Sequence, residues 1–279
     1  MRKLGILIRY EKDLAIKHNF KERFQEALDM GIESCQICFP SGEGYTDEVA
    51  GLINKARAET GMEISLLWAG WGGVDFGWNF TEGPTALGIV PQKYRASRMQ
   101  DLKNASVFAE KIGVKDIATH VGFIPENMTD PAYEPLVEAL RELCLEYKSR
   151  GQNFLFETGQ ETPVVLLRTI EKLGTGNAFI NFDTANLMLY GKGNSVDAVR
   201  VFGKYIRNTH IKDGFYPTDG LHLGHEVKVG EGLANFPVLL KMLDECGYEG
   251  PLTIEREIEG EEQKRDIMDT VNYLRELMA

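Results

Sequence analysis

Phe154-Leu155-Phe156-Glu157 is a short apolar run that ends in a carboxylate, and the second half of the chain repeats this pattern. Residues 179–183, 205–210 and 251–255 are further runs, ending in Asp183, His210 and Glu255. A turn and a helix-like segment follow each run. Polar side chains at the C-terminal ends of successive buried parallel strands are typical of an α/β barrel with its site at one mouth. The pattern therefore predicts that Glu157, Asp183, His210 and Glu255 converge.

The rest of the chain alternates between strand-like and helix-like segments, which is typical of a parallel α/β fold. Strands are predicted at residues 4–9, 34–39, 63–69, 115–121, 153–157, 178–183, 206–211 and 252–256. Helices are predicted near residues 16–30, 46–60, 92–112, 133–150, 162–173, 195–203, 235–246 and 261–278. A (β/α)₈ barrel uses about 250 residues. We therefore predict one TIM-barrel domain over residues 1–279, with long loops at residues 70–90 and 212–234 on the functional face.

Composition narrows the classes of partner. The net charge is −11 and no long basic run is present, which argues against a nucleic-acid partner. No apolar run approaches the roughly 20 residues of a membrane helix. The first strand begins at Leu4 with no apolar leader before it, so a cytoplasmic protein without a membrane partner is expected.

The four residues at the predicted strand ends form a plausible ligand set for a divalent cation. Each also has an ordinary explanation: an ion pair for Glu157, a helix N-cap for Asp183, a core hydrogen bond for His210 and a pair with Arg256 for Glu255. Three carboxylates gathered without a cation would repel one another and raise each other's pKa. Three carboxylates and one imidazole suit Mn²⁺ or Mg²⁺. We therefore interpret the set as a metal site.

Five short motifs carry a resemblance to a known superfamily. They are Thr119-His120-Val121-Gly122, residues 181–186 (Asn-Phe-Asp-Thr-Ala-Asn), His210-Ile211-Lys212-Asp213, Gly230-Glu231-Gly232 and Ile254-Glu255-Arg256-Glu257. Together with the ligand set, they make the whole chain similar to the xylose-isomerase-like TIM-barrel superfamily. This sugar isomerase and epimerase group includes ketose 3-epimerases, hydroxypyruvate isomerase, inosose isomerase and dehydratase, and endonuclease IV. The motifs are specific for the superfamily and do not specify the substrate.

The resemblance implies a divalent-metal-dependent sugar isomerase or epimerase that removes a proton next to a carbonyl. It assigns Glu157 and Glu255 as both metal ligands and catalytic acid–base groups. The cofactor would be one divalent cation, with Mn²⁺ favoured over Mg²⁺, Co²⁺ or Zn²⁺. The acidic loop at residues 258–262 would repel phosphate, so a non-phosphorylated keto sugar or polyol ketone is expected. Members of the superfamily often form dimers or tetramers, so a homo-oligomer is compatible with the resemblance.

Five further residues are candidates for substrate contacts. His120 ends the fourth predicted strand, and Trp71 is the favoured stacking residue in an aromatic, glycine-rich loop. Lys212 belongs to the motif that contains His210, and Glu257 shares the face of Glu255, so both are candidates. Asn186 stands where ketose 3-epimerases usually carry a histidine. Asparagine can bind a hydroxyl but cannot shuttle a proton at neutral pH.

Three alternatives stay open from the sequence. A lyase or dehydratase acting on an inosose-like or keto-glycoside substrate would need the same metal and the same first proton abstraction. A DNA-repair nuclease would need a histidine-rich zinc cluster, but the chain has only five histidines. A sugar-binding protein without catalysis would have no need for paired carboxylates at a metal.

Overall fold

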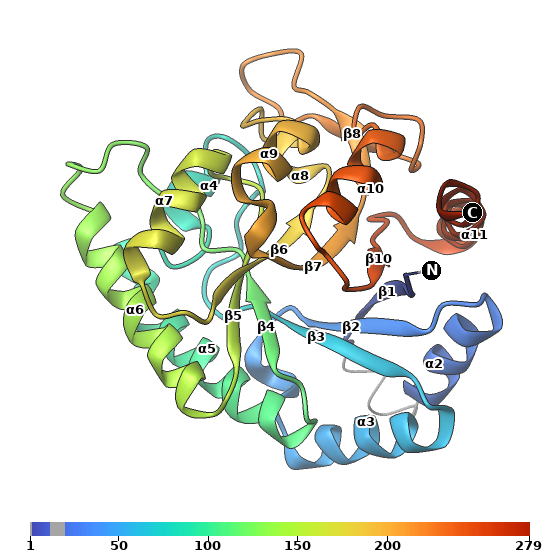
Figure 1. The fold of residues 1–279 in the computed structure, drawn as a ribbon. Coiled ribbons are helices and arrows are strands. Elements are labelled where there is room, and N and C mark those ends of the chain that lie inside the picture. The colour runs from blue at the N-terminus through green and yellow to red at the C-terminus, as the bar shows by residue number, and fades with distance from the viewer. Residues whose placement is uncertain (1, 12–19) are drawn as a thin grey trace.

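The computed structural model describes residues 2–11 and 20–279, and its centre is a closed barrel of parallel strands (Figure 1). Around the barrel, the strand order is β1-β10-β7-β6-β5-β4-β3-β2. The bounds of these strands are β1 Leu4–Arg9, β2 Ser34–Phe39, β3 Glu63–Ala69, β4 Asp116–Thr119, β5 Asn153–Glu157, β6 Ala178–Asp183, β7 Ile206–Ile211 and β10 Leu252–Ile254. The predicted (β/α)₈ architecture is confirmed.

Helices follow the strands and cover the outside of the barrel (Figure 1). The longer ones are α2 Phe20–Asp29, α3 Asp47–Thr60, α5 Gln92–Lys111, α6 Tyr133–Ser149, α7 Pro163–Leu173, α9 Ser195–Phe202, α10 Phe236–Glu245 and α11 Gly260–Met278. Of the first predicted helix, residues 16–19 lie outside the described residues, and the remainder corresponds to α2. Among the described residues, no helix is both long and apolar enough to cross a membrane.

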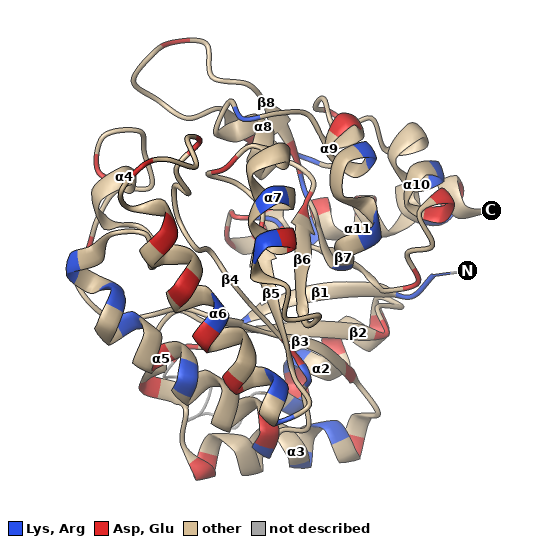
Figure 2. Cartoon of the chain, turned by 60° about the vertical axis from the view of Figure 1, so that its left-hand side comes forward, with Lys and Arg blue, Asp and Glu red and all other residues tan. Residues whose placement is uncertain are grey.

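Local sequence explains where several helices begin and end. The Thr46 hydroxyl accepts a hydrogen bond from the Val49 N–H and caps α3, and Thr162 does the same for Val165 in α7. Gly61 ends α3 with a positive φ of 77°, a conformation that glycine adopts without steric penalty. Acidic and basic residues are intermixed on the outward helix faces, as expected for solvated surfaces (Figure 2).

Two predicted strands are longer than those observed, and the long loops contain structure that was not predicted. β4 spans only Asp116–Thr119, and β10 ends at Ile254, so Glu255 follows the strand instead of lying in it. The loop after β3 contains the short helix α4 Gly83–Ala86, and α8 Asn186–Leu189 follows β6. The loop after β7 forms an antiparallel hairpin, β8 Asp213–Phe215 with β9 His225–Val227. Strands of three residues are too short to show a period-2 pattern.

One carboxylate organises the loop that follows this hairpin. Asp213 Oδ1 accepts hydrogen bonds from the N–H groups of Gly214 and Ala234, at 2.9 and 3.0 Å. Its Oδ2 accepts from Gly230 and Gly232, both at 3.0 Å. A buried carboxylate that binds several backbone N–H groups stays satisfied without a cationic partner. Asp213 therefore has a structural role, and this explains the Gly230-Glu231-Gly232 motif next to the barrel mouth.

Candidate metal centre

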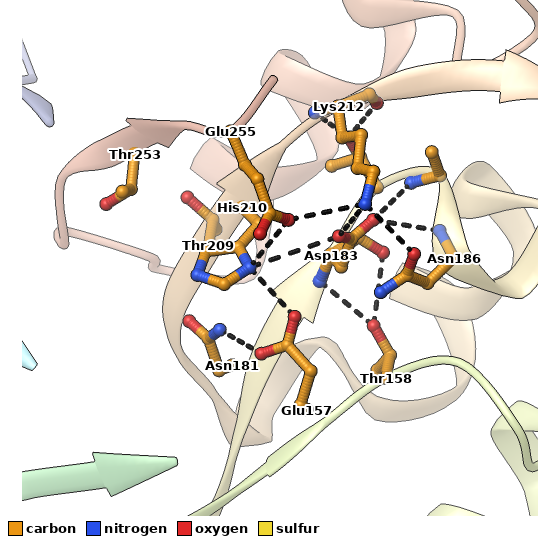
Figure 3. A network of polar contacts seen from close by, with 12 residues as sticks. Glu157, Thr158, Asn181, Asp183, Asn186, Thr209, His210, Lys212, Thr253 and Glu255 are labelled. Atoms are coloured by element: carbon orange, nitrogen blue, oxygen red, sulfur yellow. Dashed lines mark hydrogen bonds and ion pairs between the residues drawn. The ribbon is translucent and has the colours of Figure 1, made fainter. Parts of the chain in front are cut away.

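The four predicted ligands come together at the C-terminal mouth of the barrel (Figure 3). Glu157 and Asp183 are the last residues of β5 and β6, His210 lies near the end of β7, and Glu255 directly follows β10. In the strand register, Asp183 pairs with His210, and His210 pairs with Thr253. One ligand atom from each of the four residues lies within 4.8 Å of the others.

His210 is at the centre of this metal cluster, which we define as Glu157, Asp183, His210 and Glu255. Its Nδ1 is 2.8 Å from Glu157 Oε1, 3.1 Å from Glu255 Oε2 and 3.9 Å from Asp183 Oδ2. The side chains of Glu157, Asp183 and His210 are almost fully buried, and that of Glu255 is 12% exposed. The carboxylates of Glu157 and Glu255 approach from different sides of the ring (Figure 3).

A buried glutamine beneath the cluster determines which nitrogen of His210 faces the carboxylates. Gln36 Oε1 lies 2.8 Å from His210 Nε2 and can only accept, so Nε2 carries a proton. The amide orientation is supported by the acceptors around Gln36 Nε2, which include Asn208 Oδ1 at 2.8 Å and the Thr209 carbonyl oxygen at 3.1 Å. In the neutral ring, Nδ1 therefore presents a lone pair to the cluster, as metal ligation requires.

Asp183 combines a structural contact with a free ligand atom. Its Oδ1 accepts hydrogen bonds from the backbone N–H groups of Ala185 and Asn186, both at 2.8 Å, at the start of α8. The backbone of Asp183 is itself fixed, because its N–H donates to Thr158 Oγ1 at 2.9 Å and its carbonyl accepts from the same hydroxyl at 3.1 Å. The ordinary role considered for Asp183, binding helix N–H groups, thus occupies only one of its carboxylate oxygens.

The charges of the cluster perturb one another strongly. Burial disfavours a charged imidazole, but Glu157 and Glu255 outweigh it and hold the pKa of His210 well above its usual value. Burial raises the pKa of Asp183 well above its usual value, against the opposing effect of Lys212. Burial would also raise the pKa of Glu255, but Lys212 and His210 outweigh it and hold that pKa well below its usual value. Strongly perturbed groups gathered at one strand edge are characteristic of functional sites.

The donor set fits a divalent cation. Asp183 Oδ2 and His210 Nδ1 are buried and have no hydrogen-bond partner within residues 2–11 and 20–279. Buried polar atoms are normally paired, so Asp183 Oδ2 is an uncommitted acceptor, and Nδ1 of the neutral imidazole would offer a second one beside the carboxylates. Carboxylate oxygens and an imidazole nitrogen are suitable ligands for Mn²⁺, Mg²⁺ or related cations.

Lys212 lies between β7, which ends at Ile211, and β8, which begins at Asp213. It comes two residues after His210, and its side chain reaches the same cluster. Its ammonium nitrogen lies 2.9 Å from Glu257 Oε2, 3.5 Å from Glu255 Oε2 and 3.8 Å from Asp183 Oδ2. Burial opposes its charge, but these carboxylates outweigh burial and raise the pKa of Lys212 well above its usual value.

The other predicted contact residues lie at different distances from the cluster. Asn186 Oδ1 is 3.4 Å from Lys212 Nζ, and the mostly exposed Glu257 contacts the same ammonium. His120 is buried, and burial lowers its pKa. Trp71 packs against Arg98, whose guanidinium carbon lies 5.3 Å from the ring centre. Its predicted role in sugar stacking stays a prediction.

Sequence reasoning missed several residues around the site. Gln36 gave no signal, because an isolated amide in an apolar strand belongs to no motif. Asn181 begins one of the five motifs, but no role was predicted for it; its amide donates to Glu157 Oε2. Trp68, in β3, and Trp78, in the loop after it, lie edge-on to His120 with ring centres 5.8 and 5.3 Å from its ring, whereas Trp71 was the favoured stacking residue. The aromatic content of the loop indicated a place for sugar stacking, but the sequence spacing could not show which aromatic ring lies nearest to His120.

The alternative partner considered for Glu255 is engaged elsewhere. Arg256 Nη1 lies 2.9 Å from Glu226 Oε1, and Arg256 Nε lies 2.8 Å from Asp266 Oδ2. The pair with Glu226 joins the β8–β9 hairpin to the segment that follows β10. Arg256 therefore links segments at the barrel mouth and does not pair with Glu255. Glu255 contacts His210 and Lys212.

A closed parallel barrel with a carboxylate–imidazole cluster at its C-terminal mouth defines a class of α/β-barrel proteins with a candidate metal site. Within this class, the chain belongs to the xylose isomerase-like TIM barrel family, whose model matches residues 24–277. The structure is similar to that of a xylose isomerase domain protein from Planctomyces limnophilus, with a TM-score of 0.87 and 31% identity, covering 99% of this chain and 96% of that one.

More distant relatives share the fold. The 3-keto-D-glucoside 4-epimerase of E. coli has a TM-score of 0.73 and 18% identity, with 99% of both chains covered. An uncharacterized protein of Methanocaldococcus jannaschii is 24% identical over 200 residues, which span 65% of this chain and 66% of that protein. Further solved structures, each below 25% identity, include a D-psicose 3-epimerase, a probable dehydratase and a protein in complex with magnesium. The structural neighbours thus include sugar epimerases and a dehydratase.

Proposed function

We propose that this protein is a divalent-metal-dependent sugar isomerase or epimerase that acts on a non-phosphorylated keto sugar or a related polyol ketone. The observation that carries the proposal is the convergence of Glu157, Asp183, His210 and Glu255 within 4.8 Å at the barrel mouth. Their oxygen-rich donor set favours Mn²⁺, with Mg²⁺, Co²⁺ or Zn²⁺ as alternatives. The bound cation would polarise the substrate carbonyl and stabilise the negative charge that develops when the neighbouring C–H loses its proton.

The two catalytic carboxylates come from strand ends that flank the cluster. Glu157 ends β5 and Glu255 follows β10, with β6 and β7 between these strands. One carboxylate removes the proton from the carbon next to the carbonyl, and the other returns a proton to the opposite face, which inverts that carbon. Return of the proton to the adjacent carbon would give an isomer instead. Lys212, whose ammonium is buried beside Glu255, would donate a hydrogen bond to a substrate oxygen.

A lyase or dehydratase is the second candidate, and Asn186 is the observation that favours it. Asn186 lies 3.4 Å from Lys212 Nζ and cannot shuttle a proton at neutral pH. The same first proton abstraction would then be followed by loss of a leaving group from the next carbon, as water or as the alcohol of a keto-glycoside.

The test is proton exchange in D₂O. Protein loaded with Mn²⁺ is incubated with ketoses, 3-keto-glycosides and inososes, and the substrates are followed by NMR. Entry of deuterium at a carbon next to the carbonyl is expected. Inversion or isomerisation of the exchanged substrate supports the first proposal, and loss of water or an alcohol supports the second. Absence of exchange across the panel, with Mn²⁺ bound, would contradict both.

A further inference from the structure

Beside the metal cluster lies a second group of buried polar side chains, and of these only Asn186 entered the reactions described above. We call it the neutral cluster and define it as His120, Gln160, Glu161, Asn186 and Tyr190. Gln160 is 1% exposed, Glu161 3% and His120 7%. Gln160 and Glu161 belong to the turn that follows Glu157, and His120 directly follows β4.

These side chains surround Gly159. A methyl group in place of the glycine hydrogen would lie 3.5 Å from His120 Cε1, 3.4 Å from Asn186 Cβ and 3.6 Å from Tyr190 Cδ2. Glu161 is close enough to Gly159 for the backbone N–H of the glycine to lower the carboxyl pKa, against the larger effect of burial. The side chain of Gln160 is close enough to Tyr190 to lower the pKa of its hydroxyl group, although burial, the larger effect, raises that pKa to about 12. The contacts therefore place these residues in one cluster.

The neutral cluster leaves hydrogen-bonding capacity unused. Gln160 Nε2, Gln160 Oε1, Glu161 Oε1 and His120 Nδ1 are all buried and have no hydrogen-bond partner in the part of the chain that the structure describes. Leaving such a group unpaired costs about 1–3 kcal/mol, so native proteins seldom keep several together without a ligand or an ordered water. The four atoms offer both donors and acceptors, as hydroxyl groups require.

The cluster is also uncharged near neutral pH. Burial raises the pKa of Glu161 to about 8, so its carboxyl group is mostly protonated and can donate a hydrogen bond. Burial lowers the pKa of His120, which keeps the imidazole neutral. Trp68 and Trp78 lie edge-on to His120 and add apolar surface beside it. Neutral donors and acceptors next to aromatic rings suit an uncharged polyol. The adjoining ammonium of Lys212, 3.4 Å from Asn186, is already paired with Glu255 and Glu257, so it is not free to bind a phosphate group.

We infer that His120, Gln160 and Glu161 form a subsite for the hydroxyl groups of an uncharged sugar, on the β4–β5 side of the metal cluster. The inference rests on the proposed function and deepens it. The metal cluster would bind the carbonyl and deprotonate the neighbouring carbon, and every α-hydroxy ketone has both groups. The neutral cluster forms hydrogen bonds with hydroxyl groups further along the substrate. It therefore selects a neutral polyhydroxy substrate over a truncated or phosphorylated one.

The experiment compares a full-length ketose with its minimal fragment. Mn²⁺-loaded wild-type protein, Gln160→Leu and Glu161→Gln are assayed for deuterium exchange into D-psicose, D-fructose, a methyl 3-keto-D-glucoside and dihydroxyacetone. Dihydroxyacetone retains the carbonyl and an adjacent hydroxyl but has no distant hydroxyl groups. Each substitution is expected to lower kcat/KM about tenfold for the best six-carbon probe, the effect of about one hydrogen bond. Exchange into dihydroxyacetone and the Kd for Mn²⁺ should change less than about twofold.

Gln152→Leu is the matched control at the other end of β5. Gln152 is also buried, but its amide is paired, donating to the Ser106 carbonyl at 2.9 Å and accepting from the Ser106 hydroxyl. Gln152→Leu should lower thermal stability without changing the ratio of ketose to dihydroxyacetone activity. Gln160→Leu should change the ratio without lowering stability. A ratio that is unchanged in both neutral-cluster variants would overturn the subsite while leaving the proposed function intact.

A calorimetric titration of the sugars into Mn²⁺-loaded protein separates the two proposals. If wild type binds a six-carbon sugar but exchanges no proton, the proposed function fails, and weaker binding by Gln160→Leu still supports the subsite. Equal binding by wild type and Gln160→Leu overturns the subsite. If wild type neither binds nor exchanges any probe, both proposals fail.

Discussion

The metal cluster and the neutral cluster adjoin at the barrel mouth, and both contain buried polar atoms without a hydrogen-bond partner among the described residues, but the groups of the first are charged and those of the second are neutral. In the metal cluster, charged groups contact one another, and Lys212 lies 3.5 Å from Glu255 and 3.8 Å from Asp183. In the neutral cluster, Gln160 and Glu161 leave side-chain atoms unpaired among the described residues. The comparison suggests that the two clusters have different roles: the charged side chains of the metal cluster transfer the proton, and the neutral side chains bind the rest of the substrate.

Two carboxylates only four positions apart in sequence illustrate the contrast. Glu157 contacts His210 Nδ1 at 2.8 Å and accepts a hydrogen bond from Asn181, so its charge is compensated. Glu161 has no cationic side chain within ion-pair distance in the described part of the chain, and burial raises its pKa to about 8. The environment, more than the residue type, therefore separates a catalytic base from a hydrogen-bond donor.

The largest effect is expected at Glu157. Glu157→Gln keeps the shape of the side chain but removes the proposed metal ligand and base, so exchange should fall by about 10³-fold or more. The control is Glu43→Gln, which removes an exposed carboxylate after β2 and should leave exchange within about twofold of wild type. Full exchange activity in Glu157→Gln would show that proton transfer does not depend on this carboxylate.

The second effect is on stability: whereas Glu157→Gln should lose activity, Glu161→Gln should gain stability at high pH. With a pKa of about 8 in the folded state against an ordinary 4.5, Glu161 binds a proton in the native state that the unfolded chain releases between these pH values. Wild type therefore loses stability as pH rises from about 4.5 to about 8, and Glu161→Gln does not. The variant should gain on the order of 3 kcal/mol in unfolding free energy relative to wild type at pH 8, and little at pH 5.

Urea unfolding of metal-free wild type and Glu161→Gln at pH 5, 6, 7 and 8 measures this difference. Other titrating groups are shared by the two proteins and largely cancel. A difference that stays constant over this range would mean that Glu161 is ionised in the native state, and the contrast with Glu157 would disappear.

Charge also explains which parts of the site could be predicted from the sequence. Glu157, Asp183 and His210 end apolar runs, and a buried charge needs a partner, so their convergence could be inferred from the pattern. Neutral polar residues carry no such constraint. Gln160 follows a strand and Gln36 lies within one, and neither amide indicates from its sequence position what it will contact.

The fold was predictable for a related reason. All eight barrel strands overlap their predicted ranges, because most are buried apolar runs between turn signals. The β8–β9 hairpin was missed because Asp213–Phe215 and His225–Val227 are short and half polar, and because contacts distant in sequence hold it in place. One such contact is the pair between Glu226 and Arg256.

The third effect tests how the metal cluster is held in place. Gln36→Leu removes the acceptor of the His210 Nε2–H and leaves the ring free to rotate or to change tautomer. Loss of an outer partner of this kind weakens metal binding by about 10- to 100-fold. The Kd for Mn²⁺ should rise accordingly, and Gln152→Leu should leave it unchanged. Unaltered Mn²⁺ affinity in a folded Gln36→Leu protein would mean that the carboxylates alone position the cation.

The smallest effect is expected at His120, which could belong either to the neutral cluster as a binding residue or to the chemistry of the metal cluster. Its imidazole is buried next to Gly159 and lies edge-on to Trp68 and Trp78. If it only binds a hydroxyl group, His120→Ala should raise KM for a six-carbon ketose by about tenfold and lower kcat by less than about threefold. Exchange into dihydroxyacetone should be nearly unchanged. A fall in kcat comparable to that of Glu157→Gln would place His120 in the chemistry, and the proposed boundary between the charged and neutral clusters would have to move.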